Sequence, residues 1–166
     1  LAIKKNRLEI EKSSSARLLE EYNKMFRTWK TSQIFQGLAE NHLFEVLFKD
    51  VVDRLKKSDP EWREHFLDTP LGKRLNITDK LLAAREEMTP AIFYALIFYD
   101  LVSDVLHSDQ GHLAHNIKEA LMPAFERMGI PKREQENLMK VFISQPRFLV
   151  TDDERERQNT FFKKKA

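Results

Sequence analysis

The residues best suited to chemistry gather in one short polar segment: His107, Asp109, His112 and His115. Imidazole nitrogens and carboxylate oxygens are common metal ligands, so the segment has the composition of a metal site. A metal-dependent phosphohydrolase of the His-Asp type needs an adjacent His-Asp pair and further ligands from separate helices. Because Ser108 separates His107 from Asp109, we interpret the segment as a polar loop and predict no metal there.

A second group of carboxylates, Asp152 and Asp153, lies in a polar stretch. Two-metal phosphoryl transfer needs closely placed carboxylates on a rigid scaffold, and this dipeptide lacks that context. The chain contains no cysteine, which excludes disulfide bonds, cysteine zinc sites and thiol nucleophiles. A sequence without cysteine is compatible with a reducing compartment, so we expect a cytoplasmic protein.

Composition favours a helical domain. The 166 residues include four glycines and six prolines, so few breakers interrupt the elements. Charged residues make up 33% of the chain, yet the 28 basic and 26 acidic residues leave a net charge of only +2. This sum is a weak sign of nucleic-acid binding, although it does not show how the charges are sorted over the surface. We find no signal peptide and no apolar run that spans a bilayer, and we expect no membrane contact.

Helical periodicity predicts an all-α fold, an irregular bundle of about seven to nine helices. Serines at 13–15 can cap a helix, and one apolar face follows them: Leu18, Leu19, Tyr22, Met25, Phe26 and Trp29. Another stripe predicts a single helix over residues 44–55. Asp59-Pro60 should start a short helix, because aspartate caps and proline fits the first position. Thr69-Pro70-Leu71-Gly72 is predicted to be a loop.

The later half of the chain should contain the central helix. Ile77, Leu81, Ala84 and Met88 are predicted to form a buried face. Thr89-Pro90 begins the most apolar segment, which runs to about His107 and should be buried nearly all round. Pro123 should kink or split the next helix, and Gly129 should cap its end. Pro131 starts a final clear helix. The twelve phenylalanines mostly fall on helical stripes and are predicted to be core.

Several motifs in a fixed order resemble one family, the bacterial poly(A) polymerases, which are close relatives of the tRNA CCA-adding enzymes. SARLLEE at 15–21 resembles the motif that follows the neck of these enzymes. Gly37-Leu38 with LFEVLF at 43–48 resembles the next element, and MTPA at 88–91 resembles the family's Thr-Pro helix. IPKR at 130–133 and QPRF at 145–148 resemble the C-terminal region of the polymerases, although this chain has more lysine and less arginine there. The poly(A) type is preferred over CCA addition because the Thr-Pro helix and the QPRF region resemble those of the polymerases.

The resemblance implies a role in RNA processing. The family's parent enzyme adds AMP from ATP to RNA 3′ ends with Mg²⁺, and its catalytic head carries a Gly-Ser motif and an Asp-x-Asp pair. Neither motif occurs in this chain, so no residue here is expected to be catalytic and no cofactor is expected in it. Mg²⁺ and ATP belong to the head. The chain begins at Leu1 rather than Met, and we take it to be a fragment that partners with its own head and neck.

The same resemblance divides the chain into three parts. Residues 1–12 would be the end of an upstream neck-like element, residues 13–150 the helical body, and residues 151–166 a truncated C-terminal helix. In this family the neck, body and tail hold the RNA. Six residues are therefore candidate contacts to RNA: Lys132, Arg133, Arg147, Lys163, Lys164 and Lys165.

Each candidate has a plainer alternative. Lys132 and Arg133 would lie in the first turn of a helix, where exposed amide groups favour anions, but solvated surface is also open. Arg147 adjoins Phe148, which could stack on a base or lie in the core. The lysine run at 163–165 could be a solvated tail. For the whole chain, a helical protein-interaction scaffold and a metal-dependent phosphohydrolase stay open as alternatives.

Overall fold

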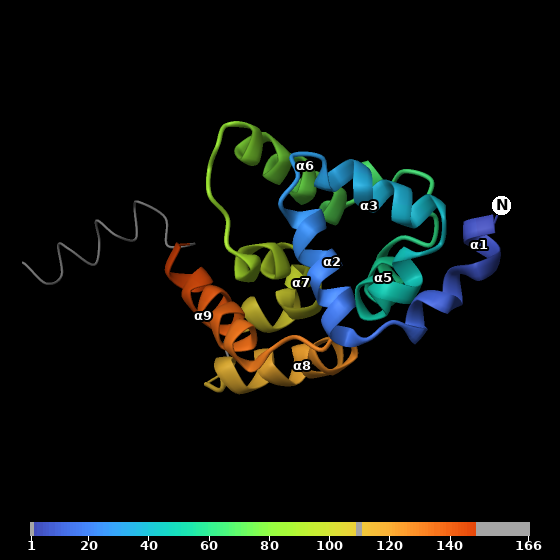
Figure 1. The fold of residues 1–166 in the computed structure, drawn as a ribbon. Helices are drawn as coiled ribbons and strands as arrows, with labels where there is room; N and C mark the ends of the chain where they lie inside the picture. Colours follow the sequence, from blue (N-terminus) through green and yellow to red (C-terminus); the bar gives the residue numbers. More distant parts are fainter. Residues whose placement is uncertain (1, 109–110, 149–166) are drawn as a thin grey trace, which may run out of the picture.

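The all-α prediction is confirmed along the computed structural model, which describes residues 2–108 and 111–148 (Figure 1). These residues form nine α-helices and two short 3-10 helices, with no strand among them. The first half of the chain contains α1 (Ala2–Asn6), η1 (Arg7–Lys12), α2 (Ser15–Phe26), α3 (Thr31–Glu40), α4 (Phe44–Leu47) and α5 (Lys49–Ser58). The second half contains η2 (Phe66–Asp68), α6 (Pro70–Ala83), α7 (Pro90–Leu106), α8 (Leu113–Met128) and α9 (Lys132–Phe148). Within the described ranges, each helix falls short of the length and hydrophobicity that crossing a bilayer requires.

Three helix starts, those of α2, α6 and α7, follow a serine cap or a Thr-Pro signal in the sequence. The Ser14 side chain accepts a hydrogen bond from the Arg17 amide and caps α2, as predicted. Thr89 and Pro90 begin α7, also as predicted. The loop predicted at residues 69–72 is wrong: Thr69 accepts from the Gly72 amide, and α6 begins at Pro70. Thr-Pro is as good a start signal there as at α7, because proline fits the first helical position.

Other boundaries depend on the core. The single helix predicted over residues 44–55 breaks at Phe48, whose buried ring lies 5.2 Å from the Phe35 ring. The short helix predicted after Asp59 is wrong; turns lead instead to η2, and the Asp59 carboxylate accepts from the Glu61 amide and contacts the His65 ring. Pro123 does not split α8, which continues through it, and Gly129 ends that helix as predicted.

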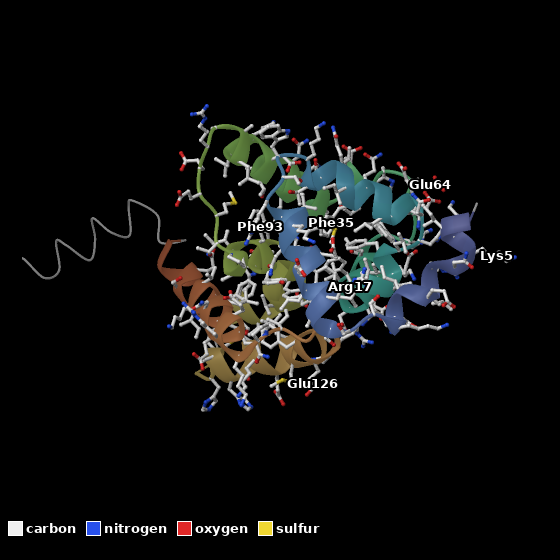
Figure 2. All side chains as sticks on the ribbon, in the orientation of Figure 1. Lys5, Arg17, Phe35, Glu64, Phe93 and Glu126 are labelled. Carbon is white, nitrogen blue, oxygen red and sulfur yellow. The ribbon has the colours of Figure 1, made fainter. Side chains whose placement is uncertain are left out.

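Helix α7 lies at the centre of the bundle. It packs against α2, α5, α6, α8 and α9 and buries seven of its residues, as its mostly apolar sequence predicts, whereas Ile92, Leu96 and Tyr99 on one face are half-buried. The aromatic rings form the core beside it; Phe93 stacks on Phe26 with 5.1 Å between the ring centroids. Burial raises the pKa of Tyr22 to about 12, and burial is also the main reason that the pKa of Tyr94 is raised. Figure 2 shows Phe35 and Phe93 between the helices, whereas Lys5 lies at the edge of the molecule.

Two predicted apolar faces are not buried as expected. Helix α2 ends at Phe26, and Trp29 lies beyond it with 66% of its surface exposed. On α6, Ile77 and Leu81 are exposed, because the helix buries the opposite face with Leu71, Leu75 and other residues.

A carboxylate decides which face of α6 turns inward. Asp79 is buried and accepts three hydrogen bonds at the start of α3: from the Thr31 amide at 2.7 Å, the Ser32 amide at 2.9 Å and the Ser32 hydroxyl at 2.6 Å. The first amides of a helix have no acceptor within it, and a negative charge there is favourable. Asp79 therefore caps α3 from another helix and fixes the turn between α2 and α3.

We predict that Asp79→Ala lowers the free energy of unfolding by about 3 kcal/mol, because it leaves buried donors without an acceptor. Urea unfolding followed by circular dichroism measures this. Asp53→Ala is the control: Asp53 pairs only with Lys49 at the surface, and its loss should cost less than about 0.5 kcal/mol. Equal effects of the two substitutions would show that Asp79 does not anchor α3.

The end of α8 closely approaches the start of α2. Gly129 has a φ of 62°, in the left-handed region, and a Cβ added to it would lie 2.6 Å from the Ser15 Cβ. Only glycine fits both the backbone conformation and the space. This contact places the beginning of α9, three residues later, near the N-terminal end of α2.

We predict that Gly129→Ala destabilises the fold by at least about 1–2 kcal/mol, the cost of the left-handed conformation alone. Gly37→Ala is the matched control, since the added Cβ in α3 meets nothing within 4 Å. Removing a helical glycine there should stabilise the protein by up to about 1 kcal/mol. Urea unfolding compares the two, and changes of the same sign would argue against the close approach of α8 to α2.

Candidate nucleic-acid interface

The structure places Lys132 and Arg133 on the surface, in the first turn of α9. Helix geometry leaves the amides of this turn without acceptors inside the helix, which favours an anion. Glu134 in the same turn works against that preference. The start of α9 alone therefore does not make an anion site, and the surroundings of Lys132 decide what it can do.

Lys132 lines a groove of about 650 Å³ between α8 and α9. On α9 the lining residues follow one helix face, because they recur at intervals of three and four: Lys132, Gln135, Glu136, Met139 and Lys140. On α8 they do the same: Lys118, Met122 and Phe125. A second hollow of about 420 Å³ continues along α8 and shares Lys118 and Met122 with the first. Arg133 is not part of the lining.

The groove has an apolar floor and a cationic rim. Met122, Phe125 and Met139 supply the floor, and three lysines stand against a single glutamate around it. Among the described residues, none of these lysines lies within ion-pair distance of an acidic side chain, and all three are exposed. Unpaired ammonium groups over an apolar surface suit a chain that carries both phosphates and flat bases.

The other predicted RNA contacts, Arg147 and Lys163 to Lys165, have side chains outside the described part of the structure. The backbone of Arg147 belongs to α9, but its side chain and that of Phe148 lie outside the described part of the structure. Lys163, Lys164 and Lys165 also lie outside it, as do Asp152, Asp153 and the helix predicted over residues 151–166.

A second set of exposed cations belongs to the start of the chain and was not among the residues predicted from the sequence. Residues 1–30 contain eight basic and four acidic residues, a net charge of +4 (8 minus 4), which exceeds the +2 of the whole chain. Lys12 pairs with Glu9, and Lys24 pairs with Glu20 and Glu21. Hydrogen bonds to Glu21 and Glu20 raise the pKa of Lys24, so this ammonium group is already engaged. Three of the four glutamates, Glu9, Glu20 and Glu21, thus have a basic partner.

Six exposed cations in this segment keep no acidic partner among the described residues: Lys4, Lys5, Arg7, Arg17, Arg27 and Lys30. They belong to α1, η1, α2 and the α2–α3 turn. We name these residues the N-terminal cations. A charge count over successive segments would have found them, whereas the sum over the whole chain hides them. Lys118 and Lys140 were missed because only the packing of α8 on α9 brings them to Lys132.

The histidines do not assemble a metal site within the described ranges, which contain no group of three His, Asp or Glu side chains able to hold an ion. His107 contacts the Ser103 carbonyl, and His115 lies 3.8 Å from Glu119 on the next turn of α8. Asp109 lies outside the described residues.

Comparison with protein families identifies the N-terminal segment. Residues 1–55 match the family model described as the probable RNA and SrmB-binding site of polymerase A. The resemblance to the poly(A) polymerases is confirmed over these residues. No curated protein and no solved structure gives a significant match to the chain.

The matched residues include all six N-terminal cations and run from α1 into α5. The α8–α9 groove lies outside the matched residues, so the family match gives no support for RNA binding by Lys132 or its neighbours. The groove and the N-terminal cations are nevertheless adjacent in the fold, because the end of α8 contacts the start of α2.

Proposed function

We propose that this chain is the RNA-holding helical region of a bacterial poly(A) polymerase, a polynucleotide adenylyltransferase that adds AMP from ATP to RNA 3′ ends. The observation that carries the proposal is the coincidence of two findings in one segment. The segment that matches the RNA-binding site of polymerase A begins with residues 1–30, which carry the surplus of exposed cations that lack an acidic partner among the described residues. In this proposal the catalytic head and neck supply the chemistry, with Mg²⁺ and ATP, and the chain itself performs no catalytic step.

The cations would act on the RNA backbone. Lysine and arginine that replace the counterions of phosphates give affinity without sequence preference, and they position a strand for an enzyme that works at its end. A cation already paired with a carboxylate contributes little, because its charge is compensated. The distinction between paired and unpaired cations therefore predicts which substitutions weaken RNA binding.

The groove between α8 and α9 extends this surface. Lys118, Lys132 and Lys140 would contact phosphates, while the floor of Met122 and Met139 would accept the faces of bases. Arg133 remains a candidate at the edge of the same helix, and Arg147 and Lys163 to Lys165 remain predictions. RNA crossing from the N-terminal cations to the groove would follow α2 along its length.

The test is RNA affinity measured at several salt concentrations with a variant that replaces Lys118, Lys132 and Lys140 by glutamine. Each lost phosphate contact reduces the slope of log affinity against log salt by about 0.7 for a single strand, so the triple variant should lose about two units of slope. The matched control replaces Lys12, Lys24 and Lys49, which are paired with carboxylates, and removes the same total charge. The control should change the slope by less than about one unit.

The outcomes distinguish a specific role of the groove lysines from a general effect of net charge. If the control weakens binding as much as the groove variant, only net charge matters and the groove has no specific part. If the wild-type protein binds no RNA even at low salt, the proposed function is wrong. All six lysines are exposed, so urea unfolding should give nearly the same midpoint for both variants and exclude misfolding as the cause.

A protein-binding function is a second candidate, because the description of the matched family names SrmB beside RNA. A helical scaffold that binds only protein would show no salt-dependent affinity for RNA. The RNA titration described above therefore distinguishes it from the RNA-holding function.

A further inference from the structure

We propose that Trp29 is a stacking platform for a base of single-stranded RNA, held between Arg27 and Lys30 at the turn between α2 and α3. The proposal rests on the RNA-holding function and assigns it a specific contact. Trp29 has the largest exposed fraction, 66%, among the exposed large apolar side chains of the described residues. Isolated leucines and isoleucines on a surface need no explanation, but indole is the largest apolar side chain and is usually well buried.

The turn presents Trp29 rigidly. On one side of it Phe26 is buried, stacked on Phe93 and edge-on to Tyr94. On the other side the amides of Thr31 and Ser32 donate to Asp79. Because both flanks are anchored in the core, the four residues between them must lie outside it.

Hydrogen bonds inside the turn fix its shape. The Thr28 hydroxyl donates to the Met25 carbonyl at 3.1 Å, and the Thr31 hydroxyl donates to the Thr28 carbonyl at 3.0 Å. The Arg27 amide donates to the Lys24 carbonyl, which closes the end of α2. A backbone whose shape is already fixed loses little conformational freedom when a base stacks on the ring that it carries.

The charges beside the ring point to a polyanion that carries flat groups. Arg27 and Lys30 are exposed, and among the described residues neither has an acidic partner. Two carboxylates earlier on α2, Glu20 and Glu21, pair with Lys24, and Asp79 accepts hydrogen bonds from the start of α3. A base on the indole with phosphates on the flanking cations is how proteins bind single strands with little sequence preference.

The position of Trp29 agrees with this role. The turn lies within residues 1–55, the segment that matches the polymerase A RNA-binding site. In Figure 1 it lies at the top of the view near α6, while α8 and α9 lie at the bottom. Helix α2 joins the two ends and spans roughly 18 Å, at 1.5 Å for each of its 12 residues. Trp29 and the groove would therefore contact different nucleotides of one strand.

The experiment uses the intrinsic fluorescence of the full chain, which has two tryptophans, the exposed Trp29 and the buried Trp62. Titration with an oligoadenylate should quench the exposed indole, and an abasic ribose-phosphate oligomer of the same length should not. In Trp29→Ala the remaining Trp62 signal should not respond to RNA. This variant should also bind oligoadenylate about tenfold more weakly, since one stacked base contributes roughly that factor or more.

Three further variants make the result specific. Trp29→Phe keeps an aromatic face and should retain most of the affinity for oligoadenylate. Arg27→Gln combined with Lys30→Gln should weaken binding of the oligoadenylate and of the abasic oligomer alike. Lys24→Gln, on the same helix but already paired, should change neither.

Two outcomes would overturn the proposal. Salt-dependent RNA binding with no quenching, and with full affinity in Trp29→Ala, would leave the RNA-holding function intact but remove Trp29 from it, and would point to a protein partner for the exposed ring. Equal loss of affinity for the abasic oligomer in Trp29→Ala would show that stacking is not the cause. Absence of all RNA binding would instead refute the RNA-holding function itself.

Discussion

The burial of α7 among five other helices is the constraint that shapes this molecule. A helix that is apolar nearly all round must be covered from several directions, and α2, α5, α6, α8 and α9 provide that cover. Because α8 and α9 both pack on α7, they lie against each other, and the side chains on their outer edges form the groove. Helix α2 packs on α7 through Phe26, and the four residues that follow, 27–30, are exposed before the chain becomes buried again at Thr31.

The cations of the chain divide into two groups by what they contact. Four arginines connect helices or turns that are distant in sequence: Arg54 to Asp104, Arg63 to Glu45, Arg74 to Asp100 and Arg127 to Asp50. Arg74 is the most firmly held, since it also donates to the Leu96 carbonyl and lies over the Tyr99 ring. Among the described residues, the lysines of the groove and the N-terminal cations make no such contacts. The fold therefore uses these four arginines for its long-range ion pairs, and a separate set of exposed cations can contact a partner.

The sequence predicted the features that depend on nearby residues. The caps at Ser14 and Gly129 and the start of α7 follow from local chemistry, and the apolar character of α7 indicated that it is central. The errors arise where distant residues decide. Trp29 continues the apolar period of α2, but the Asp79 cap on α3 forces the chain to turn before it. Ile77 was predicted to be buried, yet Asp79 on the same helix faces α3 and turns Ile77 outward. Lys132 was found from a motif, whereas Lys118 joins it only through the packing of α8 on α9.

The central claim is that single-stranded RNA lies along one surface from the α2–α3 turn to the groove between α8 and α9. Photo-cross-linking with an RNA that carries a photoreactive base, followed by mass spectrometry of the cross-linked peptides, tests it most directly. The account predicts cross-links in the peptide that contains Trp29 and in those that contain Met122 or Met139. Cross-links confined to the other exposed apolar residues, such as Ile77 and Leu81 on α6, would contradict it.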